Sequence, residues 1–300
     1  MSGIATAPAL SIVIAAWNGA PALRQCLASL QSQIAGEDCE VIVVSNFSKV
    51  GIEDLFDSFP SLNMFCLPAA TVPELRACGI EKAGGDIVAL LEDHCTFDRH
   101  WFAQIKEAHK LPYSVIGGAV ENAAGMLLSW AVYFYDYGKY MLPDAGHVVT
   151  SLSGNNVSFK KPVLREVRDH YENGFYEASI LEELQRRGYQ LYLIPSAIVY
   201  HNKDYALKSA IADSYHHGRL FAARRVSGAP LAQRVFRGAT SFLLPVLLPL
   251  RIAMRTLRKK RHVRQLAMSF PYLLVLMTAW SCGEFCGYAW SEGASARHWK

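Results

Sequence analysis

The stretch DIVALLEDH, residues 86–94, indicates the fold class most directly. Five apolar residues run without interruption after Asp86, and two carboxylates and an imidazole follow them. A short apolar run bounded by polar residues is typical of a strand that is buried on both faces of a parallel sheet. Ligands bind to open α/β sheets at the carboxyl ends of such strands. Glu92, Asp93 and His94 are therefore candidates for a ligand-binding site.

Similar apolar runs alternate with helical patterns on the N-terminal side of this stretch. Pro21 follows a Trp-Asn-Gly turn, where a helix would begin, and apolar residues then recur at helical spacing. Strands that alternate with helices need crossover connections, which produce a mainly parallel central sheet covered on both faces. The predicted fold class is therefore α/β. The predicted strands cover residues 11–16, 40–45, 62–67 and 86–91, and the predicted helices begin at Pro21 and cover residues 52–59 and 72–83.

The pattern is less regular after residue 100. Neither GxGxxG after the first predicted strand nor GxxxxGK(S/T) occurs, so the dinucleotide-binding and P-loop classes lack their phosphate-binding loops. An aromatic-rich stretch, residues 127–140, is compatible with a helix or with a ligand-facing loop. Further strands are predicted over residues 115–120, 148–160 and 190–200, and further helices over residues 177–187 and 205–226.

The composition describes a folded chain with two different regions. Hydrophobic residues make up 51% of the 300 residues and charged residues 19%, which excludes intrinsic disorder. Seven cysteines occur without a CxxC pair, so neither a zinc knuckle nor a disulfide framework is indicated. Residues 1–213 hold 16 Lys and Arg against 24 Asp and Glu, whereas residues 214–283 hold 12 Lys and Arg and no acidic residue. We therefore predict a boundary after Asp213.

The region after this boundary has the features of a membrane-associated segment. Residues 265–283 are 19 uncharged residues, within the range of about 17–25 that spans a bilayer. A re-entrant hairpin or a buried docking helix is the alternative for this segment. Residues 241–250 are too short to cross and contain Pro245 and Pro249, so we expect them to lie in the interface or to re-enter the membrane. Anionic membrane lipids are the expected partner of the basic run 251–264, and nucleic acid is not an expected partner.

The predicted location follows from the N-terminus and from the basic run. The first apolar run lacks a preceding basic segment, so we expect no signal peptide and an N-terminal region in the cytoplasm. By the positive-inside rule, residues 251–264 lie on the same face of the membrane. We therefore predict the inner (cytoplasmic) membrane, with residues 1–213 facing the cytoplasm.

Five sequence blocks follow one another: SIVIAAWNGAPALRQCLASLQSQ (11–33), EVIVVSNFS (40–48), LRACGIEKAGGDIVALLEDH (75–94), SGNNVSFKK (153–161), and LEELQRRGY (181–189) before LIPSAIVYH (193–201). In order and spacing they resemble the inverting family 2 glycosyltransferases of the GT-A fold, of the membrane-associated bacterial type. The resemblance covers residues 9–205. It implies a GT-A catalytic domain over residues 1–213, followed by a basic, amphipathic and transmembrane region over residues 214–300.

The resemblance also implies an activity. A family member of this type moves a sugar from a nucleotide-sugar, expected to be a UDP-sugar, to an acceptor with inversion. The basic and apolar C-terminal region makes a lipid-linked or membrane-proximal glycan acceptor the expected one. The expected biological role is the synthesis of cell-envelope glycans or glycolipids.

The resemblance implies a divalent metal at Glu92-Asp93-His94, which occupies the place of the family's Asp-x-Asp motif. His94 stands where the family has its last aspartate. Because imidazole suits Mn²⁺ better than Mg²⁺, the expected metal is Mn²⁺ rather than Mg²⁺. His201 matches a histidine that completes the metal shell in related enzymes, and an ordinary strand-end histidine is the alternative. The implied metal ligands are therefore Asp93, His94 and His201.

The family's catalytic base is an acidic residue at the start of the helix before this histidine, and Glu177 falls on that position. Inverting transfer needs one carboxylate that takes the proton of the acceptor hydroxyl while the sugar is displaced in line. The alternative for Glu177 is an acid that only stabilises the helix N-terminus. We expect Glu182 and Glu183 on the solvated face of the helix, with Glu182 as the reserve candidate.

The resemblance implies donor contacts from the first two strand ends, the third helix and the Gly-Asn-Asn turn. Ser45 stands where the family has an aspartate that accepts from the uracil imide, and serine accepts less strongly. Arg76 is expected to hold the diphosphate or the nucleoside loop, with a structural salt bridge as the alternative. The two asparagines offer amides to sugar hydroxyls or form a ligand-free turn. The implied nucleotide-sugar-binding residues are Ala15, Trp17, Ser45, Arg76, Glu92, Asp93, Asn155 and Asn156.

Two other functions remain compatible with the sequence. A sugar-1-phosphate nucleotidyltransferase shares the α/β layout, but it would carry a basic Gly-rich loop after the first strand, and WNGAPALRQ is not one. A degenerate, non-catalytic membrane scaffold of the same fold is favoured by the departures at Ser45 and His94. Hydrolysis of a UDP-sugar by the purified protein would distinguish an enzyme from a scaffold.

Overall fold

The computed structural model describes residues 8–48, 59 and 62–298, which form two compact units. The first unit comprises Met1–Glu121 and Tyr140–Asn202, and the second comprises Asn122–Lys139 and Lys203–Lys300. The predicted boundary after Asp213 falls inside helix α9 (Leu207–Arg225), because the charge composition changes there without interrupting the helix. The helix predicted over residues 52–59 falls, apart from Phe59, outside the described residues.

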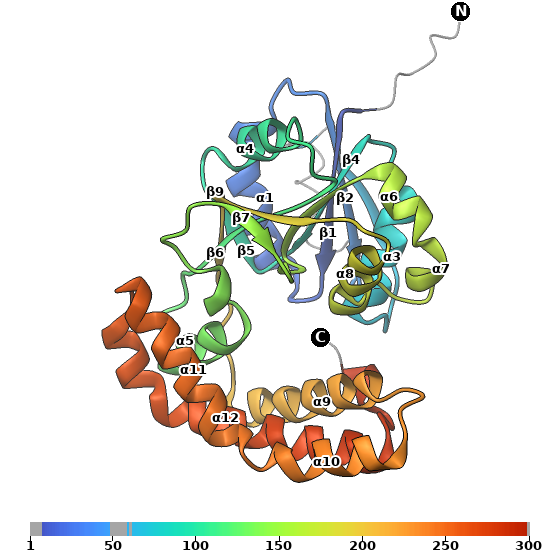
Figure 1. Ribbon diagram of the computed structural model, residues 1–300. Helices are drawn as coiled ribbons and strands as arrows, with labels where there is room; N and C mark the ends of the chain where they lie inside the picture. Colours follow the sequence, from blue (N-terminus) through green and yellow to red (C-terminus); the bar gives the residue numbers. More distant parts are fainter. Residues whose placement is uncertain (1–7, 49–58, 60–61, 299–300) are drawn as a thin grey trace, which may run out of the picture. The chain divides into compact units, whose positions relative to one another are not determined.

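Four strands form the parallel half of the central sheet in the first unit (Figure 1). They lie in the order β3, β2, β1, β4, and each neighbouring pair is parallel. Strand β1 is buried along its whole length, as expected for a strand covered on both faces. The elements are β1 (Leu10–Ala16), α1 (Ala20–Ile34), β2 (Cys39–Ser45), β3 (Leu62–Cys66), α3 (Val72–Lys82) and β4 (Ile87–Glu92), and the predicted bounds agree with them to within one residue.

The other half of the sheet is antiparallel. Strand β8 pairs with β4 and β6, and β9 pairs with β5 and β7, all in antiparallel register. In the described part of the chain, nine strands form one sheet in the order β3-β2-β1-β4-β8-β6-β9-β5, with β7 on β9. The predicted parallel character therefore belongs to the first four strands. The added strands are β5 (Cys95–Phe97), β6 (Val115–Asn122), β7 (His147–Val149), β8 (Asn156–Lys160) and β9 (Leu191–His201), so the strand predicted over residues 148–160 divides around the Gly-Asn-Asn turn.

Helices cover both faces of the parallel half. Ile12 and Ile14 of β1 belong to the core cluster that α1 and α4 (Trp101–Ala108) complete. Val13 faces the other way, toward Gly79 of α3. After β8 the chain forms α6 (Lys161–Glu166), α7 (Arg168–Tyr171) and α8 (Glu177–Arg186). The Phe175 N–H donates to the Pro73 carbonyl oxygen at 2.8 Å, which brings the start of α8 beside the start of α3.

The second unit is helical. It contains α5 (Leu127–Asp136), α9, α10 (Leu231–Ser241), α11 (Leu244–Lys259) and α12 (Val263–Trp290), with η2 (Ser295–His298) as a short 3₁₀ turn. A second 3₁₀ turn, η1 (Gly138–Tyr140), lies at the boundary where the chain returns to the first unit. The aromatic-rich stretch is thus a helix, and its Tyr133 and Phe134 are buried. Helix α12 packs against α5, α9, α10 and α11. A Cβ at Gly283 would collide with the Tyr215 carbonyl oxygen, so glycine lets α9 approach closely.

One helix of the described chain, α12, is long and apolar enough to cross a membrane. Helices α10 and α11 pass the same test only as a pair, and they meet at 67°. This agrees with the prediction that residues 241–250 alone do not cross. The core helix of a soluble protein can have the same length and composition.

Candidate active site

The ends of β1 and β4 bring Asp93 under a turn that follows the first strand. Ala15 lies opposite Glu92 in the parallel register, and the Asp93 N–H donates to the Ala15 carbonyl oxygen at 3.2 Å. Asn18 donates twice to the Asp93 carboxylate: its backbone N–H to Oδ2 and its Nδ2 to Oδ1, each at 2.7 Å. Asp93 is 1% exposed, so these two bonds compensate the burial of its charge.

Two histidines gather beside Asp93. Strands β5 and β9 pair so that Cys95 lies opposite His201, and the Asn202 N–H donates to the His94 carbonyl oxygen at 2.9 Å. The His94 and His201 rings meet edge to face with centroids 4.7 Å apart. His94 Nδ1 lies 3.1 Å from Asn18 Nδ2, and His94 Nε2 lies 3.3 Å from Glu92 Oε2. The structure thus brings together the predicted residues Glu92, Asp93, His94 and His201.

Arg76 connects this cluster to the candidate base. Its guanidinium is buried and pairs with Glu92 through Nη2 and with Glu177 through Nη1, the latter at 2.8 Å from Oε2. This is the salt bridge that the sequence left open as the alternative to a diphosphate contact. Gly154 lies against the guanidinium, and a Cβ there would stand 2.7 Å from Nη2. Three segments far apart in sequence therefore converge on one arginine.

Glu177 is the first residue of α8, and its side chain is 24% exposed. It is thus held by Arg76 on one side and accessible on the other. Glu182 is exposed on the same helix. The prediction that Glu183 lies on the solvated face is wrong, because its side chain is 9% exposed and pairs with Arg186 and Arg187. Hydrogen bonds from these two arginines lower the pKa of Glu183 to about 2.

The predicted nucleotide side of the site lies at the ends of β1 and β2. Ala16 pairs with Ser45 in register, Ala15 is buried, and Trp17 is half-buried in the turn after β1. The Ser45 hydroxyl is buried and donates to the Phe47 carbonyl oxygen at 2.7 Å. Its proton is therefore used locally in this conformation, which leaves its oxygen as the acceptor for a ligand.

The two asparagines of the Gly-Asn-Asn turn have different surroundings. The Asn156 Nδ2 donates to the carbonyl oxygens of Ala119 and Ala197, and its Oδ1 accepts from the Trp101 indole N–H, at 2.9–3.0 Å. Both of its amide protons are therefore used inside the sheet, and its observed role is to join strands rather than to offer bonds to a sugar. Asn155 is also buried; its Oδ1 accepts from Ser153, and its Nδ2 lies 3.6 Å from the Cys95 sulfur. Burial raises the pKa of the Cys95 thiol well above its usual value.

The side chains at the strand ends fit a metal ion that is shared with a diphosphate better than a metal ion held by protein ligands alone. Among the described residues, no group of three or more His, Cys, Asp or Glu side chains is arranged as a complete ligand set. Catalytic Mg²⁺ and similar hard ions are commonly held by one or two carboxylates together with substrate phosphates. Asp93 offers hard oxygens, and the imidazole of the buried His94 lies 3.8 Å from Asp93 Oδ1. These two residues suit such a shared ion, whereas His201, also predicted as a ligand, does not complete a three-residue ligand set with them among the described residues.

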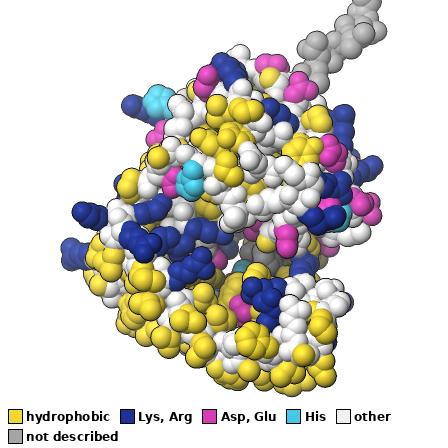
Figure 2. All heavy atoms as spheres, viewed as in Figure 1, with side chains coloured by type: hydrophobic (Ala, Val, Ile, Leu, Met, Phe, Trp, Pro, Cys, Tyr) yellow, Lys and Arg dark blue, Asp and Glu magenta, His cyan; other side chains and the backbone are white. Residues whose placement is uncertain are grey.

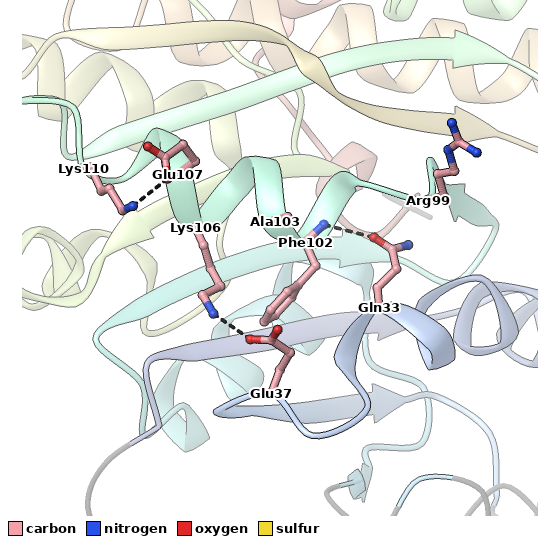
Figure 3. Close-up of a pocket in the computed structure, with 8 residues that line it drawn as sticks. All are labelled: Gln33, Glu37, Arg99, Phe102, Ala103, Lys106, Glu107 and Lys110. Carbon is pink, nitrogen blue, oxygen red and sulfur yellow. Dashed lines mark hydrogen bonds and ion pairs between the residues drawn. The ribbon is translucent and has the colours of Figure 1, made fainter.

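A separate cavity of about 240 Å³ lies on the surface of the first unit between α1 and α4 (Figure 3). Its walls carry an ion pair between Lys106 and Glu37 at 2.6 Å and a hydrogen bond from the Phe102 N–H to Gln33 at 3.1 Å. None of the predicted site residues lines it. The strand-end cluster, rather than this cavity, is therefore the candidate active site.

Sequence reasoning did not single out Asn18 as a site residue. The Trp-Asn-Gly turn indicated where the first helix begins, but no local signal connects Asn18 with an aspartate 75 positions away. The same holds for Gly154, which the turn motif contained but which gains its role only from the approach of Arg76. Contacts of this range arise from the pairing of β1, β4 and β8.

Comparison with known proteins agrees with this geometry. The sequence model of Glycosyl transferase family 2 matches residues 11–168, more than half of the chain. The fold is similar to that of a mannosyltransferase, PcManGT from Pyrobaculum calidifontis in complex with GDP-Man and Mn2+, at a TM-score of 0.57 and 14% identity over 92% of this chain and 87% of that chain. It is also similar to S. aureus TarS 1-349 in complex with UDP-GlcNAc, at a TM-score of 0.52 and 12% identity over 92% and 90% of the two chains.

A comparison with curated protein sequences gave no match. At 12–14% identity, the structural likeness shows the fold alone. The family match carries the assignment further, because it covers β1 to β8 and includes Arg76, Glu92 and Asp93. The chain has the GT-A fold, belongs to glycosyl transferase family 2, and is a glycosyltransferase.

Proposed function

We propose that the chain moves a sugar from a nucleoside diphosphate sugar to an acceptor hydroxyl with inversion, and that Glu177 is the catalytic base. One observation carries this proposal: Arg76 holds the carboxylates of Glu92 and Glu177 at the same guanidinium. Glu177 is thereby fixed next to the strand ends at which ligands of α/β sheets bind. A base must lie within hydrogen-bond reach of the proton it takes, and the partial exposure of Glu177 leaves room for an acceptor.

The proposed donor is a UDP-sugar. The base and ribose would lie at the ends of β1 and β2, near Trp17 and Ser45, and the diphosphate would lie near Asp93. The Ser45 oxygen would accept from the uracil imide N–H and would thereby favour uracil. A carboxylate at this position would accept more strongly and favour uracil more. Asn155, at the turn beside Arg76, is the proposed contact of the donor sugar. Asn156 supports that turn from within the sheet.

A divalent ion, proposed to be Mn²⁺, belongs to this donor complex. Asp93 and His94 would hold it together with diphosphate oxygens, and His201 would support His94 through the edge-to-face ring contact. When bound, such an ion supplies positive charge that stabilises the leaving diphosphate. Asn18 orients the Asp93 carboxylate by its two hydrogen bonds.

The proposed reaction is a single displacement. The acceptor oxygen attacks the anomeric carbon from the side opposite the diphosphate, so that the new C–O bond forms as the bond to the phosphate oxygen breaks. The electron pair of the broken bond leaves on the diphosphate, and Glu177 Oε1 or Oε2 takes the acceptor proton. Arg76 orients Glu177 and keeps its carboxylate facing the donor.

The proposed acceptor is a lipid-linked or membrane-proximal glycan, in the synthesis of cell-envelope glycans or glycolipids. The support is the basic, apolar second unit, in which residues 214–283 contain no acidic residue. The proposed location is the cytoplasmic face of the inner membrane, where the catalytic unit would meet a soluble nucleotide-sugar. The boundary proposed from charge, after residue 213, marks the start of this basic part.

Steady-state kinetics of Glu177→Gln tests the proposal. We expect kcat to fall by about 10²-fold or more, the scale of a removed general base, while donor affinity is retained. Glu182→Gln is the matched control, because Glu182 lies on the same helix and is exposed. Normal turnover by Glu177→Gln together with a loss in Glu182→Gln would contradict the assignment of the base. Absence of UDP-sugar hydrolysis and transfer in the wild-type protein would favour the scaffold alternative.

A further inference from the structure

Helix α10 turns its apolar side chains outward. Leu231, Val235 and Phe236 are 73%, 61% and 68% exposed. The opposite side of α10 carries Gly238 and Ser241, which are buried. A helix of a water-soluble protein normally buries its apolar stripe and exposes its polar one. The arrangement of α10 is the reverse, and water is therefore not the medium that this face suits.

Helix α11 and the turn before it extend the same surface. Phe242 and Leu243 of the turn are exposed, whereas Ile252 and Thr256 on the inner side of α11 are buried. Figure 2 shows hydrophobic side chains gathered over these two helices. A contiguous apolar patch on this scale marks an interaction surface. We define the outward face as Leu231, Val235, Phe236, Phe242, Leu243, Val246, Leu247, Leu250, Met254 and Leu257.

The charges around the outward face have one sign. Arg251 and Arg258 are exposed on α11, and Lys260, Arg261 and Arg264 are exposed in and after the turn to α12. No acidic residue occurs in the sequence between residues 214 and 283. Apolar side chains flanked only by cations are typical of helices that lie in the headgroup region of an anionic bilayer. Charge complementarity therefore selects an anionic lipid surface as the occupant.

Helix α12 carries buried polar side chains that a spanning helix would take toward the bilayer. Glu284 accepts from the Trp280 indole N–H at 2.6 Å and from the Tyr288 hydroxyl at 2.9 Å. The Ser281 hydroxyl donates to the Ser241 carbonyl oxygen of α10 at 2.7 Å. The first two bonds lie within α12 itself, and the third joins α12 to α10. The bond to α10 agrees with the docking helix that the sequence had left open as an alternative.

The neighbour of α12 is a charged helix. Gly283 and Gly287 lie against the backbone of α9 around Tyr215 and Arg219. Arg219 donates to the Ser291 carbonyl oxygen at 2.9 Å, just beyond the end of α12. If α12 crossed the bilayer in this packing, the adjacent turn of α9, with Arg219, would enter the bilayer with it. Charged side chains at that depth are costly.

We propose that the outward face lies in the headgroup region of an anionic bilayer, and that α12 remains inside the second unit without crossing. The chain is then a monotopic membrane protein. This inference specifies the membrane partner of the proposed function. It rests on the proposed function only for the identity of the acceptor. It is tested by lipid binding and by topology, neither of which requires turnover.

Sedimentation of the full-length protein with lipid vesicles tests the lipid surface. We expect binding to vesicles of phosphatidylglycerol and phosphatidylcholine, and much weaker binding to phosphatidylcholine alone. Val235→Glu with Phe236→Glu should lower the partition coefficient by about tenfold or more, because it removes apolar area and adds negative charge. Leu111→Glu with Val148→Glu is the matched control on the first unit, where both side chains are also exposed. The control should bind like the wild type.

Leu247→Glu with Leu250→Glu on α11 gives a second test, and circular dichroism and UDP-sugar binding check that each variant is folded. Equal vesicle binding by the folded variants and the wild type would overturn the proposal. So would equal binding to neutral and anionic vesicles. A dimer that forms without lipid and is lost in both variants would show that a second copy covers this face, which also overturns it.

Protease treatment of spheroplasts tests the topology, with an epitope fused after Lys300. We expect the epitope to survive until the cells are lysed, because α12 does not carry it across the membrane. Loss of the epitope in intact spheroplasts would overturn the monotopic arrangement. Loss of turnover with normal vesicle binding would contradict only the proposed function, and a wild-type protein that binds the donor but not anionic vesicles would contradict only this inference.

Discussion

Replacement of Gly154 by alanine tests whether Arg76 holds Glu177 in position. A Cβ at this residue would lie 2.7, 2.8 and 2.9 Å from Nη2, Nη1 and Cζ of Arg76, whereas ordinary van der Waals contact begins at 3.4 Å. The guanidinium must therefore move by roughly half an ångström or more from atoms it is packed against. Gly154 does not have a positive φ, so alanine adds a steric clash without backbone strain.

The displacement should affect stability and rate together. Overpacking of a buried site costs about 1–3 kcal/mol, and one kcal/mol lowers the Tm of a domain of this size by about 2–4 °C. The 2.8 Å bond from Arg76 to Glu177 has little room to stretch before it is lost. Because a misplacement of about 1 Å can lower a rate by about 10²-fold, we expect a large fall in kcat with a smaller change in donor affinity.

The assay compares thermal unfolding and steady-state transfer in Gly154→Ala and Gly125→Ala. Gly125 is the matched control, because a Cβ there meets nothing within 4 Å. The control should behave like the wild type in both measurements. The reasoning is refuted if the two variants have the same Tm and the same kcat, since the ion pair would then tolerate the added methyl group.

Three further predictions concern Asp93, the metal and Glu183. Asn18→Ala removes one of two 2.7 Å hydrogen bonds to the buried Asp93 carboxylate and frees the turn that supplies the other, so the free energy of unfolding should fall by about 1–3 kcal/mol and UDP should bind more weakly. Asn63→Ala, on the exposed side of β3, is the control and should change neither quantity. Calorimetry measures the stability, and titration with UDP measures the binding. Turnover should require a divalent ion, with Mn²⁺ at least as effective as Mg²⁺, and Asp93→Ala should abolish it; full activity in excess chelator would contradict the metal proposal. The pKa of Glu183 is lowered to about 2 in the folded chain, below the unfolded value of about 4.3, so its stabilising contribution is complete above about pH 5 and is lost as the pH falls toward 2. Glu183→Gln should therefore flatten the acid side of a plot of Tm against pH, and an unchanged acid side would contradict this account.

The parts of the candidate site that the sequence predicted are those that lie at strand ends. Glu92, Asp93 and His94 follow an apolar run whose length and bounds indicate a buried strand, and His201 ends another such run. Parallel pairing of β1 and β4 and antiparallel pairing of β5 and β9 then bring these ends together. The site could be located in this way because the position of a strand end is a local property of the sequence.

The roles of individual side chains could not be predicted in the same way. Asn156 has the same residue type and motif as Asn155, yet its amide joins Ala119 to Ala197 inside the sheet. Glu183 has the exposed helical neighbours typical of a surface acid, yet two arginines enclose it. Which partner a polar group finds depends on segments tens of residues away, and their approach is a property of packing.

The sequence by itself determined the α/β alternation, the family and the strand-end location of the candidate site. Hydrophobic periodicity and motif order are properties of the sequence alone and do not depend on how distant segments pack. Only the tertiary structure decided that Arg76 joins Glu92 to Glu177, whose positions differ from its own by 16 and 101 residues. It also decided that the apolar residues of α10 face outward, because helical periodicity defines a stripe but not the side on which other helices pack. The physical reason is the same in both cases: local patterns select elements, and long-range packing selects which of their faces and charges meet.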